Sequence, residues 1–598
     1  MTRTSFAFTN FTAGQLSDRL TGRVDLSKYK NGCSELTNFV VHPHGGATRR
    51  PGTQYVASVK TQNLKTRLFG FEFNQEQTYI IEAGNQYFRF YKDDGQILDS
   101  GSPYEISTPY LTAELFSLRF AQSADTMYIV HNNHAPRKLT RTGHTSWTLT
   151  EVDFEYGPMQ DINTTTTTIT ASGRTGSITL TASANLFAAT DVGRLVKIYE
   201  GWAKITAFTN ATTVTATVQK NLKGDAELLP EYTSDTISFV EGDPDATGSE
   251  HNDRIVDTNK DFVNQNFQVG QKITVSSSSS NNGTYLIVSV TADTILTGPS
   301  DDLANESAGS NKTIVGTLEA TDEWRLGAFS ETTGFPAAVC FYEERLVYAG
   351  TSDQPQTIFF SESGGFDQFN TGAETADAMI YTIASSTVDF IRYLSPGRSL
   401  VCGTSGGEFV VTSGTTADPI SPTNIQIKKQ ASYGTANVQP VNAGNATLFL
   451  QRAKRKVREL SYSFDVDGYV APDLTLLAED VSESGIEDMA LQQEPDNIVW
   501  AVRADGVLIG MTYRREEDVV AWHQHILGGY SDTGKNIIAQ AISFTANSTT
   551  VNVSADTITL SSHGLSTGDQ VYYNADSNLI GGLVTSIPYF VIATDANT

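Results

Sequence analysis

Residues 486–523 read IEDMALQQEPDNIVWAVRADGVLIGMTYRREEDVVAWH, and this stretch shows the plan of the fold. It contains four apolar runs, Ile486–Leu491, Ile498–Val502, Val507–Tyr513 and Val519–His523. The three connections are short and rich in Pro, Asp, Glu and Gly, residues that favour tight turns. Short apolar runs joined by tight turns predict an antiparallel meander. Four such strands make up one blade of a β-propeller.

The second run of this unit has five counterparts earlier in the chain. The six apolar runs of this kind start at Tyr79, Met127, Leu346, Leu400, Leu448 and Ile498. Four of the five intervals between them are about 50 residues, which is the length of one four-stranded blade. In the first unit Phe69, Phe71 and Phe73 alternate, so their rings are expected on one face of a sheet. We therefore predict a mainly β protein with a six-unit propeller-like core.

The interval between the second and third units is longer than the others by about 170 residues, which predicts an insertion. Within it, DVGRLVKI at Asp191 and QVGQKITV at Gln268 each place a Gly before alternating apolar residues. Both are followed by further strand-like runs, so we expect inserted small β-barrel or sandwich modules. A related sequence, STGDQVYY at Ser566, begins a C-terminal module that stops at Thr598 before its expected last strand.

These units predict five segments. Residues 1–60 form an N-terminal arm and platform segment, and residues 61–156 form propeller units 1 and 2. Residues 157–320 form the inserted β modules, residues 321–535 form propeller units 3 to 6, and residues 536–598 form an incomplete C-terminal β module. Little helix is expected, because apolar residues do not recur at helical spacing over any long stretch.

The stretch from Phe6 to Val56 is too polar to form a core of its own. We expect a half-extended arm, one short helix and a turn-rich entry into a sheet. The predicted features, in order, are a helix N-cap at Asp25, a C-cap at Asn31 and Gly32, a strand at Phe39–Val41, turns at His42–Gly46 and Arg49–Gly52, and strand entry at Gln54–Ala57.

The order NF-x-AGQLS, GRVDLSKY and NFVVHPHGGATRRPGT within this stretch resembles the N-terminus of the tail nozzle proteins of short-tailed phages, also called tail tubular protein B. The resemblance continues in Trp324–Phe369, Ser421–Phe464 and Ser484–Gly528, and covers roughly two thirds of the chain. It implies a structural protein of the virion tail, assembled in the host cytoplasm as a homo-hexamer around a DNA channel, without catalysis.

The same resemblance implies three kinds of partner. A tail adaptor, or head–tail connector, would join the ring above, and a tail fibre or spike would join it at the side. DNA would pass through the lumen without sequence-specific binding, retained by loops that move aside for ejection.

The chain carries a formal net charge of −26, from 41 Lys and Arg against 67 Asp and Glu. This charge repels nucleic acid, because tight binding to phosphates needs basic side chains. Two interpretations stay open. The charge can serve solubility alone, or it can keep phosphates off the wall of the duct that the resemblance implies.

No enzyme activity, cofactor, metal site or membrane span is predicted. The three cysteines, Cys33, Cys340 and Cys402, are far apart and odd in number, which argues against disulfides or a zinc site. His42 and His44 fall in a predicted turn without a third ligand nearby. Acidic pairs fall in predicted hairpin turns, and sequence motifs of nucleotide triphosphatases, zinc peptidases and serine hydrolases do not occur. Apolar runs stay well short of the roughly 20 residues of a membrane helix.

His523 and His525 flank Gln524 in the last predicted strand of the sixth unit. A half-buried structural role is the expected one for this pair, because carboxylate partners would have to come from other loops.

The sharpest local feature is a run of basic residues: Arg452, Lys454, Arg455, Lys456 and Arg458. They form either a solvated hairpin tip or a contact with phosphates or with an acidic neighbouring subunit. Arg49 and Arg50 are the second candidates. The resemblance implies that their block builds the hexamer and meets the adaptor.

The alternative to a nozzle is a carbohydrate-binding or carbohydrate-cleaving β-propeller that acts as a receptor-binding tail component. Its candidate sugar-stacking residues are Trp202, Trp324, Trp500 and Trp522. They fall in strand-like runs, where packing into the core is the usual role of tryptophan.

Overall fold

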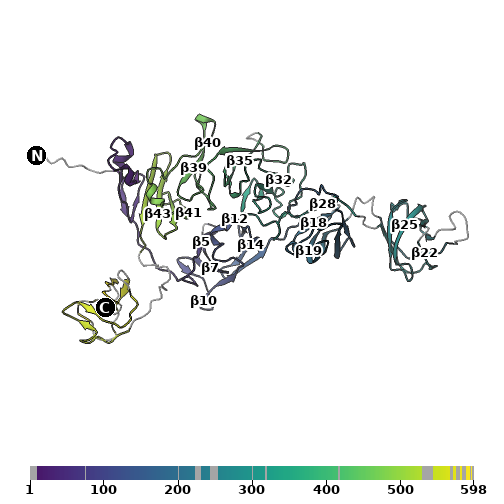
Figure 1. The fold of residues 1–598 in the computed structure, drawn as a ribbon, viewed down its shortest axis with the longest axis horizontal. Coiled ribbons are helices and arrows are strands. Elements are labelled where there is room, and N and C mark those ends of the chain that lie inside the picture. The colour runs from purple at the N-terminus through teal and green to yellow at the C-terminus, as the bar shows by residue number, and fades with distance from the viewer. Residues whose placement is uncertain are drawn as a thin grey trace.

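The computed structural model describes residues 10–598 apart from 75, 199–200, 223–229, 243–252, 299–300, 317–319, 415–417, 528–542, 566–569, 574, 576–579, 582, 584–587, 593 and 596–598. Within this part of the chain, six antiparallel meanders of four strands each form a β-propeller core (Figure 1). The predicted mainly β fold, with a six-unit propeller-like core and added β modules, is confirmed.

Each blade is a meander whose strands pair in chain order. Blades 1 to 3 consist of β5 (Arg67–Asn74), β6 (Gln77–Gly84), β7 (Tyr87–Lys92) and β11 (Glu105–Ser107); β12 (Arg119–Ser123), β13 (Thr126–His131), β14 (His134–Gly143) and β15 (Ser146–Glu151); and β29 (Ala338–Tyr342), β30 (Arg345–Ala349), β31 (Thr357–Phe360) and β32 (Met379–Thr382). Blades 4 to 6 consist of β33 (Ile391–Ser395), β34 (Leu400–Thr404), β35 (Gly407–Ser413) and β36 (Ile425–Ala431); β37 (Val441–Ala443), β38 (Ala446–Leu450), β39 (Val457–Ser463) and β40 (Gly468–Val470); and β41 (Ile486–Gln492), β42 (Ile498–Arg503), β43 (Leu508–Arg514) and β44 (Val519–His525).

All six marker runs are the second strand of their blade: β6, β13, β30, β34, β38 and β42. The hairpin turns at Asp93–Asp94, Glu343–Glu344 and Glu516–Asp518 are acidic, as predicted. Asp93 and Asp94 have φ of 51° and 58°, and Glu343 and Glu344 have φ of 45° and 60°. Two successive residues with positive φ form the turn whose twist matches that of the flanking strands.

Neighbouring blades bury apolar residues between their faces. Phe71, Phe90 and Trp147 pack together between blades 1 and 2, with ring centroids 4.3–4.8 Å apart around Trp147. Cys340 and Cys402 lie in the cluster between blades 3 and 4, where burial raises the pKa of both thiols. Similar clusters join blades 2 and 3, 4 and 5, and 5 and 6.

The junction between blade 6 and blade 1 is polar. Among the described residues, no buried apolar cluster joins these two blades. Instead, Arg67 on β5 pairs with Asp488 on β41, with Nε 2.8 Å from the carboxylate. The Arg67 side chain is only 5% exposed, and it also donates to the carbonyl oxygens of Leu115 and Leu118. One ion pair therefore closes the ring.

Residues 10–50, here called the arm platform, pack on blade 6. Their elements are β1 (Gly14–Gln15), η1 (Asp18–Leu20), η2 (Ser27–Asn31), β2 (Gly32–Cys33), β3 (Phe39–Val41) and β4 (Ala47–Arg49). Strand β1 pairs in parallel with β44, which extends the sheet of blade 6 to six strands. This pairing requires a glycine, because Gly14 has φ of 64° and a Cβ there would lie 2.4 Å from the backbone nitrogen of Trp522.

The strand Phe39–Val41 and the turn at His42–Gly46 are confirmed. The prediction for the helix was wrong in its details. It is the 3-10 helix η2, which follows Leu26 without a side-chain cap, while Asp25 pairs with Arg23 at 2.7 Å. Gly32 is extended, with φ of −132°, because it enters β2 rather than capping a helix.

Gln54–Ala57 forms no strand, which corrects the predicted sheet entry. The part of the arm before Asn10 lies outside the described residues.

Two modules follow blade 2, and a further pair of hairpins follows blade 6. The first module consists of β16 (Ile169–Ala171), β17 (Ser177–Ala182), β18 (Leu195–Ile198), β19 (Gly201–Asn210), β20 (Thr213–Lys220) and, after the predicted boundary at 320, β28 (Trp324–Leu326). The second consists of β21 (Glu231–Ser234), β22 (Ile237–Val240), β23 (Arg254–Asp257), β24 (Lys272–Ser276), β25 (Gly283–Val290), β26 (Thr294–Thr297) and β27 (Lys312–Gly316). The C-terminal hairpins are β45 (Val551–Asn552) with β46 (Thr557–Ile558) and β47 (Gln570–Tyr572) with β48 (Pro588–Phe590). Residues 566–569 of the predicted third repeat lie outside the described residues.

Replacing Gly14 with Ala should detach β1 from β44, because the added Cβ meets the backbone of Trp522. Gly22→Ala is the matched control, since Gly22 also has a positive φ, of 82°, but has nothing within 4 Å of its Cβ position. Hydrogen exchange should show segments 13–17 and 519–525 losing protection about ten-fold or more in Gly14→Ala alone. Equal losses in both variants would contradict the clash.

Asp488→Asn should destabilise the ring by roughly 3 kcal/mol, because it leaves the buried Arg67 charge without its partner. Asp505→Asn is the control. It removes the more exposed pair with Arg503 on the same blade, and such a pair contributes about 0–1 kcal/mol. Thermal unfolding should show a clear fall in Tm for Asp488→Asn and little change for Asp505→Asn. Equal falls would mean that the closing pair has no special role.

Candidate functional site

Arg49 and Arg50 lie at the end of the β3–β4 hairpin of the arm platform. The backbone N–H of Arg50 donates to the carbonyl of Asn38 at 2.8 Å, and its guanidinium donates to the carbonyl of Pro51 at 2.7 Å. Arg50 therefore helps to hold the hairpin. Arg49 is exposed, so its charge is available to another molecule.

His42 fastens this hairpin to the propeller. Its Nδ1 lies 2.7 Å from a carboxylate oxygen of Asp496 in the β41–β42 turn, and its Nε2 lies 2.8 Å from the hydroxyl of Thr48. The Thr512 hydroxyl of β43 also donates to the carbonyl of Val41 at 2.7 Å. Both ring nitrogens of His42 are thus occupied within the chain, while His44 is exposed. The structure does not bring these two histidines together around a common point.

His523 and His525 are fully buried rather than half-buried, with exposures of 0% and 1%. Their partner is not a carboxylate, because Nδ1 of His523 lies 2.6 Å from Nε2 of His525. Burial lowers the pKa of His523 to about 3, and burial with the nearby Arg50 charge lowers the pKa of His525 to about 4. The pair is neutral at physiological pH and packs against Trp500.

The basic run forms the tip of the β38–β39 hairpin, as its sequence predicted. Three of its five cations make contacts within the chain, two of them ion pairs. Lys454 lies 3.2 Å from a carboxylate oxygen of Glu487, and Lys456 lies 2.7 Å from Asp473. Arg458 is buried and donates to the carbonyl of Ala471 at 2.6 Å.

Arg452, Arg455 and Lys456 are the exposed members of the basic run, and of these Lys456 is paired with Asp473. The structure therefore leaves two of its five cations open to another molecule, together with Arg49 on the arm platform.

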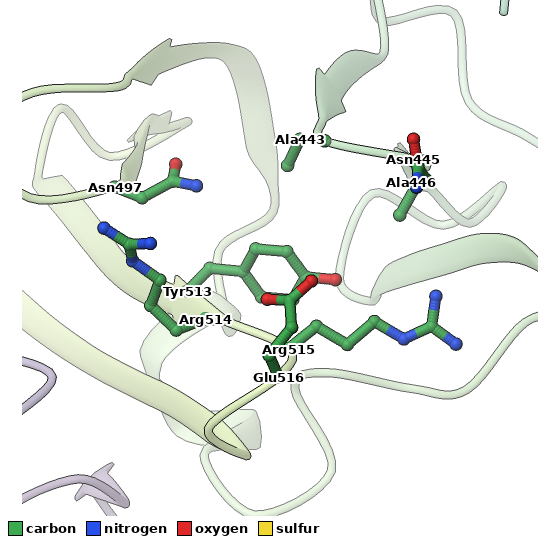
Figure 2. Close-up of a pocket in the computed structure, with 9 residues that line it drawn as sticks. Ala443, Asn445, Ala446, Asn497, Tyr513, Arg514, Arg515 and Glu516 are labelled. Carbon is green, nitrogen blue, oxygen red and sulfur yellow. The ribbon is translucent and has the colours of Figure 1, made fainter.

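A cleft of about 600 Å³ lies between blades 5 and 6, at the other end of β38 from the basic run (Figure 2). It is lined by Ala443, Gly444, Asn445, Ala446, Asn497, Tyr513, Arg514, Arg515 and Glu516. Arg515 pairs with the buried Glu459 of blade 5 at 3.1 Å. Burial and the nearby Glu459 raise the pKa of the Tyr513 hydroxyl. A lining with cations, a carboxylate and an amide suits a polar group of a neighbouring molecule.

Sequence reasoning did not identify this cleft. The local sequence predicts only an acidic turn at Glu516–Asp518. Two adjacent arginines before that turn are the only sequence feature that could have indicated the cleft. The neighbouring sequence does not show that the β37–β38 turn lies opposite them.

Comparison with known proteins gives no family. No protein-family model matches the chain, and no curated protein does. Among solved structures, an auxiliary nutrient binding protein from Bacteroides thetaiotaomicron is 8% identical, with 62% of this chain and 71% of that chain covered and a TM-score of 0.21. Its counterpart from Bacteroides ovatus is 8% identical over 60% and 85%, with a TM-score of 0.23, and Hsv2p from Kluyveromyces lactis is 9% identical over 68% and 96%, with a TM-score of 0.19. These similarities are too low to support an argument, and the propeller assignment rests on the six sheets.

The described residues include no helix of sufficient length and apolar character to cross a membrane.

The histidine pair should make stability depend on pH. In the folded chain both imidazoles stay neutral down to about pH 4, whereas in the unfolded chain they take up protons below about pH 6.5. The unfolded state then binds more protons, so stability should fall as the pH drops from about 6.5 towards 4. His525→Gln should reduce the difference in Tm between about pH 7.5 and about pH 5, and the exposed His44→Gln should not. An unchanged difference in His525→Gln would contradict the assignment.

Proposed function

We propose that this chain is a structural subunit of the tail of a short-tailed phage. Six copies would form a nozzle around a channel that retains DNA and opens for ejection. The ring would meet an adaptor above and a fibre or spike at its side, and it would be assembled in the host cytoplasm. The chain itself would carry out no catalysis.

The observation that carries the proposal is the block of residues 10–56. Its sequence resembles the nozzle proteins, and the arm platform within it is tied to blade 6 by strand pairing and by the His42 contact. The block also leaves large apolar side chains uncovered: Val24, Phe39, Tyr55 and Val56 are 69%, 39%, 75% and 44% exposed. Uncovered apolar residues, two of them on the anchored arm platform and two just after it, favour burial against another subunit.

Charge supports the same proposal. A channel wall must let phosphates pass, and the net charge of −26 gives the chain few strong phosphate contacts. In the densest basic run, two of the five cations are neutralised by carboxylates elsewhere in the chain, through the pairs of Lys454 with Glu487 and Lys456 with Asp473.

The carbohydrate-binding alternative shares the propeller fold. However, Trp202, Trp324 and Trp522 are buried, with exposures of 8%, 8% and 1%, and Trp500 packs on His525. The first three rings are therefore unavailable as a platform for sugar, and Trp500 is half-buried. We keep the nozzle as the proposal.

Mass photometry of the full chain, with negative-stain images, tests the proposal that six copies form a ring. We expect particles of about six times the 64.8 kDa chain mass with a central opening. Tyr55→Asp should reduce the ring fraction, because a charge at this exposed apolar site opposes burial against a neighbour. Val269→Asp is the matched control, since Val269 is 63% exposed but lies in the second inserted module.

A chain that stays monomeric at every concentration would overturn the proposal. Equal loss of rings in Tyr55→Asp and Val269→Asp would overturn the role given to residues 10–56.

A further inference from the structure

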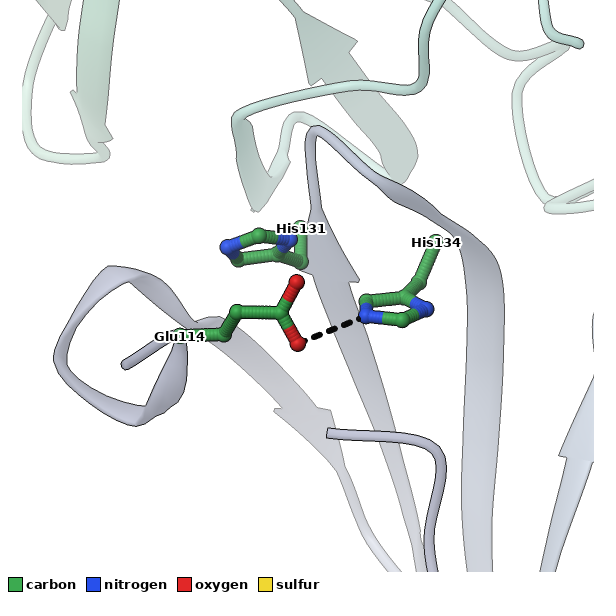
Figure 3. A group of neighbouring side chains, drawn as sticks. All are labelled: Glu114, His131 and His134. Carbon is green, nitrogen blue, oxygen red and sulfur yellow. Dashed lines mark hydrogen bonds and ion pairs between the residues drawn. The ribbon is translucent and has the colours of Figure 1, made fainter. Parts of the chain in front are cut away.

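Three side chains that can ligate a metal meet where the linker between blades 1 and 2 passes the β13–β14 hairpin (Figure 3). His131 ends β13 and His134 begins β14, and the two residues are partners across a two-residue turn. Glu114 comes from the linker, just before η3 (Leu115–Ser117). One ligand atom from each of the three side chains lies within 4.8 Å of the others.

The distances fit a small cation. Zinc holds nitrogen and oxygen ligands at about 2.0–2.2 Å in a tetrahedron, which places them roughly 3.3 Å from one another. Nε2 of His134 is already 2.8 Å from Oε2 of Glu114. Side-chain adjustments of roughly 1 Å would let all three groups contact one ion. Figure 3 shows the Glu114 carboxylate between the two imidazoles.

The surrounding groups hold these side chains in place. The Leu111 backbone N–H donates to Oε2 of Glu114 at 2.9 Å, and the Asn133 amide donates to Oε1 at 3.2 Å. The Tyr110 ring packs with its edge toward His134 at 5.3 Å. Supporting contacts of this kind orient ligands before the metal arrives.

One contact would compete for a His131 nitrogen. The Asn133 backbone N–H donates to Nδ1 of His131 at 3.2 Å, which is at the long limit for such a bond.

The group is also accessible. The side chains of Glu114 and His134 are 14% and 21% exposed, while His131 is buried. An ion can therefore enter from solvent and still be largely enclosed. Two imidazoles and one carboxylate form a ligand set that zinc uses, with a fourth position left for water.

We propose that Glu114, His131 and His134 bind one divalent transition-metal ion, and that zinc is the ion that fits. The bound ion fastens the linker between blades 1 and 2 to the β13–β14 hairpin. The same hairpin reaches blade 3, because the Asn132 amide donates to the carbonyl oxygens of Phe335 and Gly350 at 3.2 and 3.1 Å. The site therefore strengthens three successive blades, whichever assembly the chain forms.

The competing interpretation is a simple contact between Glu114 and His134, and the two differ in the role of His131. A metal-free contact does not need His131, whereas a metal site does. His131→Gln is for this reason the decisive variant. His144→Gln is the matched control, because it removes an exposed histidine from the same blade.

The experiment uses the full chain without a tag, stripped of metal with a chelator and then titrated with Zn²⁺ in competition with a chromophoric chelator. We expect one equivalent of zinc, and a rise in Tm as zinc is added. His131→Gln and His134→Gln should each weaken the affinity about ten-fold or more and lose the rise in Tm, while His144→Gln should keep both. Co²⁺ should give the visible absorption of a four-coordinate ion in the wild-type chain and in His144→Gln, but not in His131→Gln or His134→Gln.

Either of two results would overturn the proposal: no bound equivalent, or unchanged zinc affinity in His131→Gln when circular dichroism shows that the variant is folded. Because the readouts are metal affinity and Tm, they are independent of whether the chain forms rings.

Discussion

An ion pair closes the ring of blades. A propeller is stable only when every sheet has both faces covered, and in this chain five of the six interfaces do so with apolar side chains. The sixth depends on Arg67 and Asp488, which bring together the first strands of the first and last blades. Charged groups are costly to bury, but their geometry is directional. A directional contact therefore fixes how blade 6 meets blade 1, the junction at which the ring closes.

The surroundings of this pair are polar on the blade 2 side as well. Arg119 on β12 is buried, donates to the carbonyl of Leu118 at 2.8 Å, and reaches the side-chain oxygen of Asn437, which precedes blade 5. Burial, with the neighbouring Arg67 charge, lowers the pKa of Arg119 to about 9. The contact between Arg119 and Asn437 thus joins blade 2 to the segment before blade 5, two parts of the ring that are not adjacent.

Sequence periodicity predicted the blades because each one repeats a local pattern of strand and turn. Their second strands are the most apolar, as in Leu346–Ala349 and Leu400–Cys402, where both faces are buried. Contacts between distant segments had no such signal. His42 and Asp496 are 454 residues apart, and only the folded ring brings the arm to that turn.

The two groups of histidines show the same limit. The Glu114 carboxylate meets His131 and His134 only because a linker crosses a hairpin, and neither segment alone indicates a metal site. The pair His523 and His525 was visible in the sequence, but its burial depends on β1 and β3 packing over blade 6. The prediction for the helix near Asp25 was wrong for a related reason. Pairing of β2 with β1 draws Gly32 into an extended conformation, so the local preference for a helix end does not decide it.

The basic run shows that cations clustered in the sequence can be paired with carboxylates from other segments in the folded chain. In the sequence it is an exception in an acidic chain, and phosphate binding is a natural interpretation. In the structure Lys454 reaches Glu487 on the next blade, and Arg515 of that blade reaches back to Glu459. The two pairs run in opposite directions across the same junction, so they fasten blades 5 and 6. What remains for other molecules from this run is the exposed pair Arg452 and Arg455.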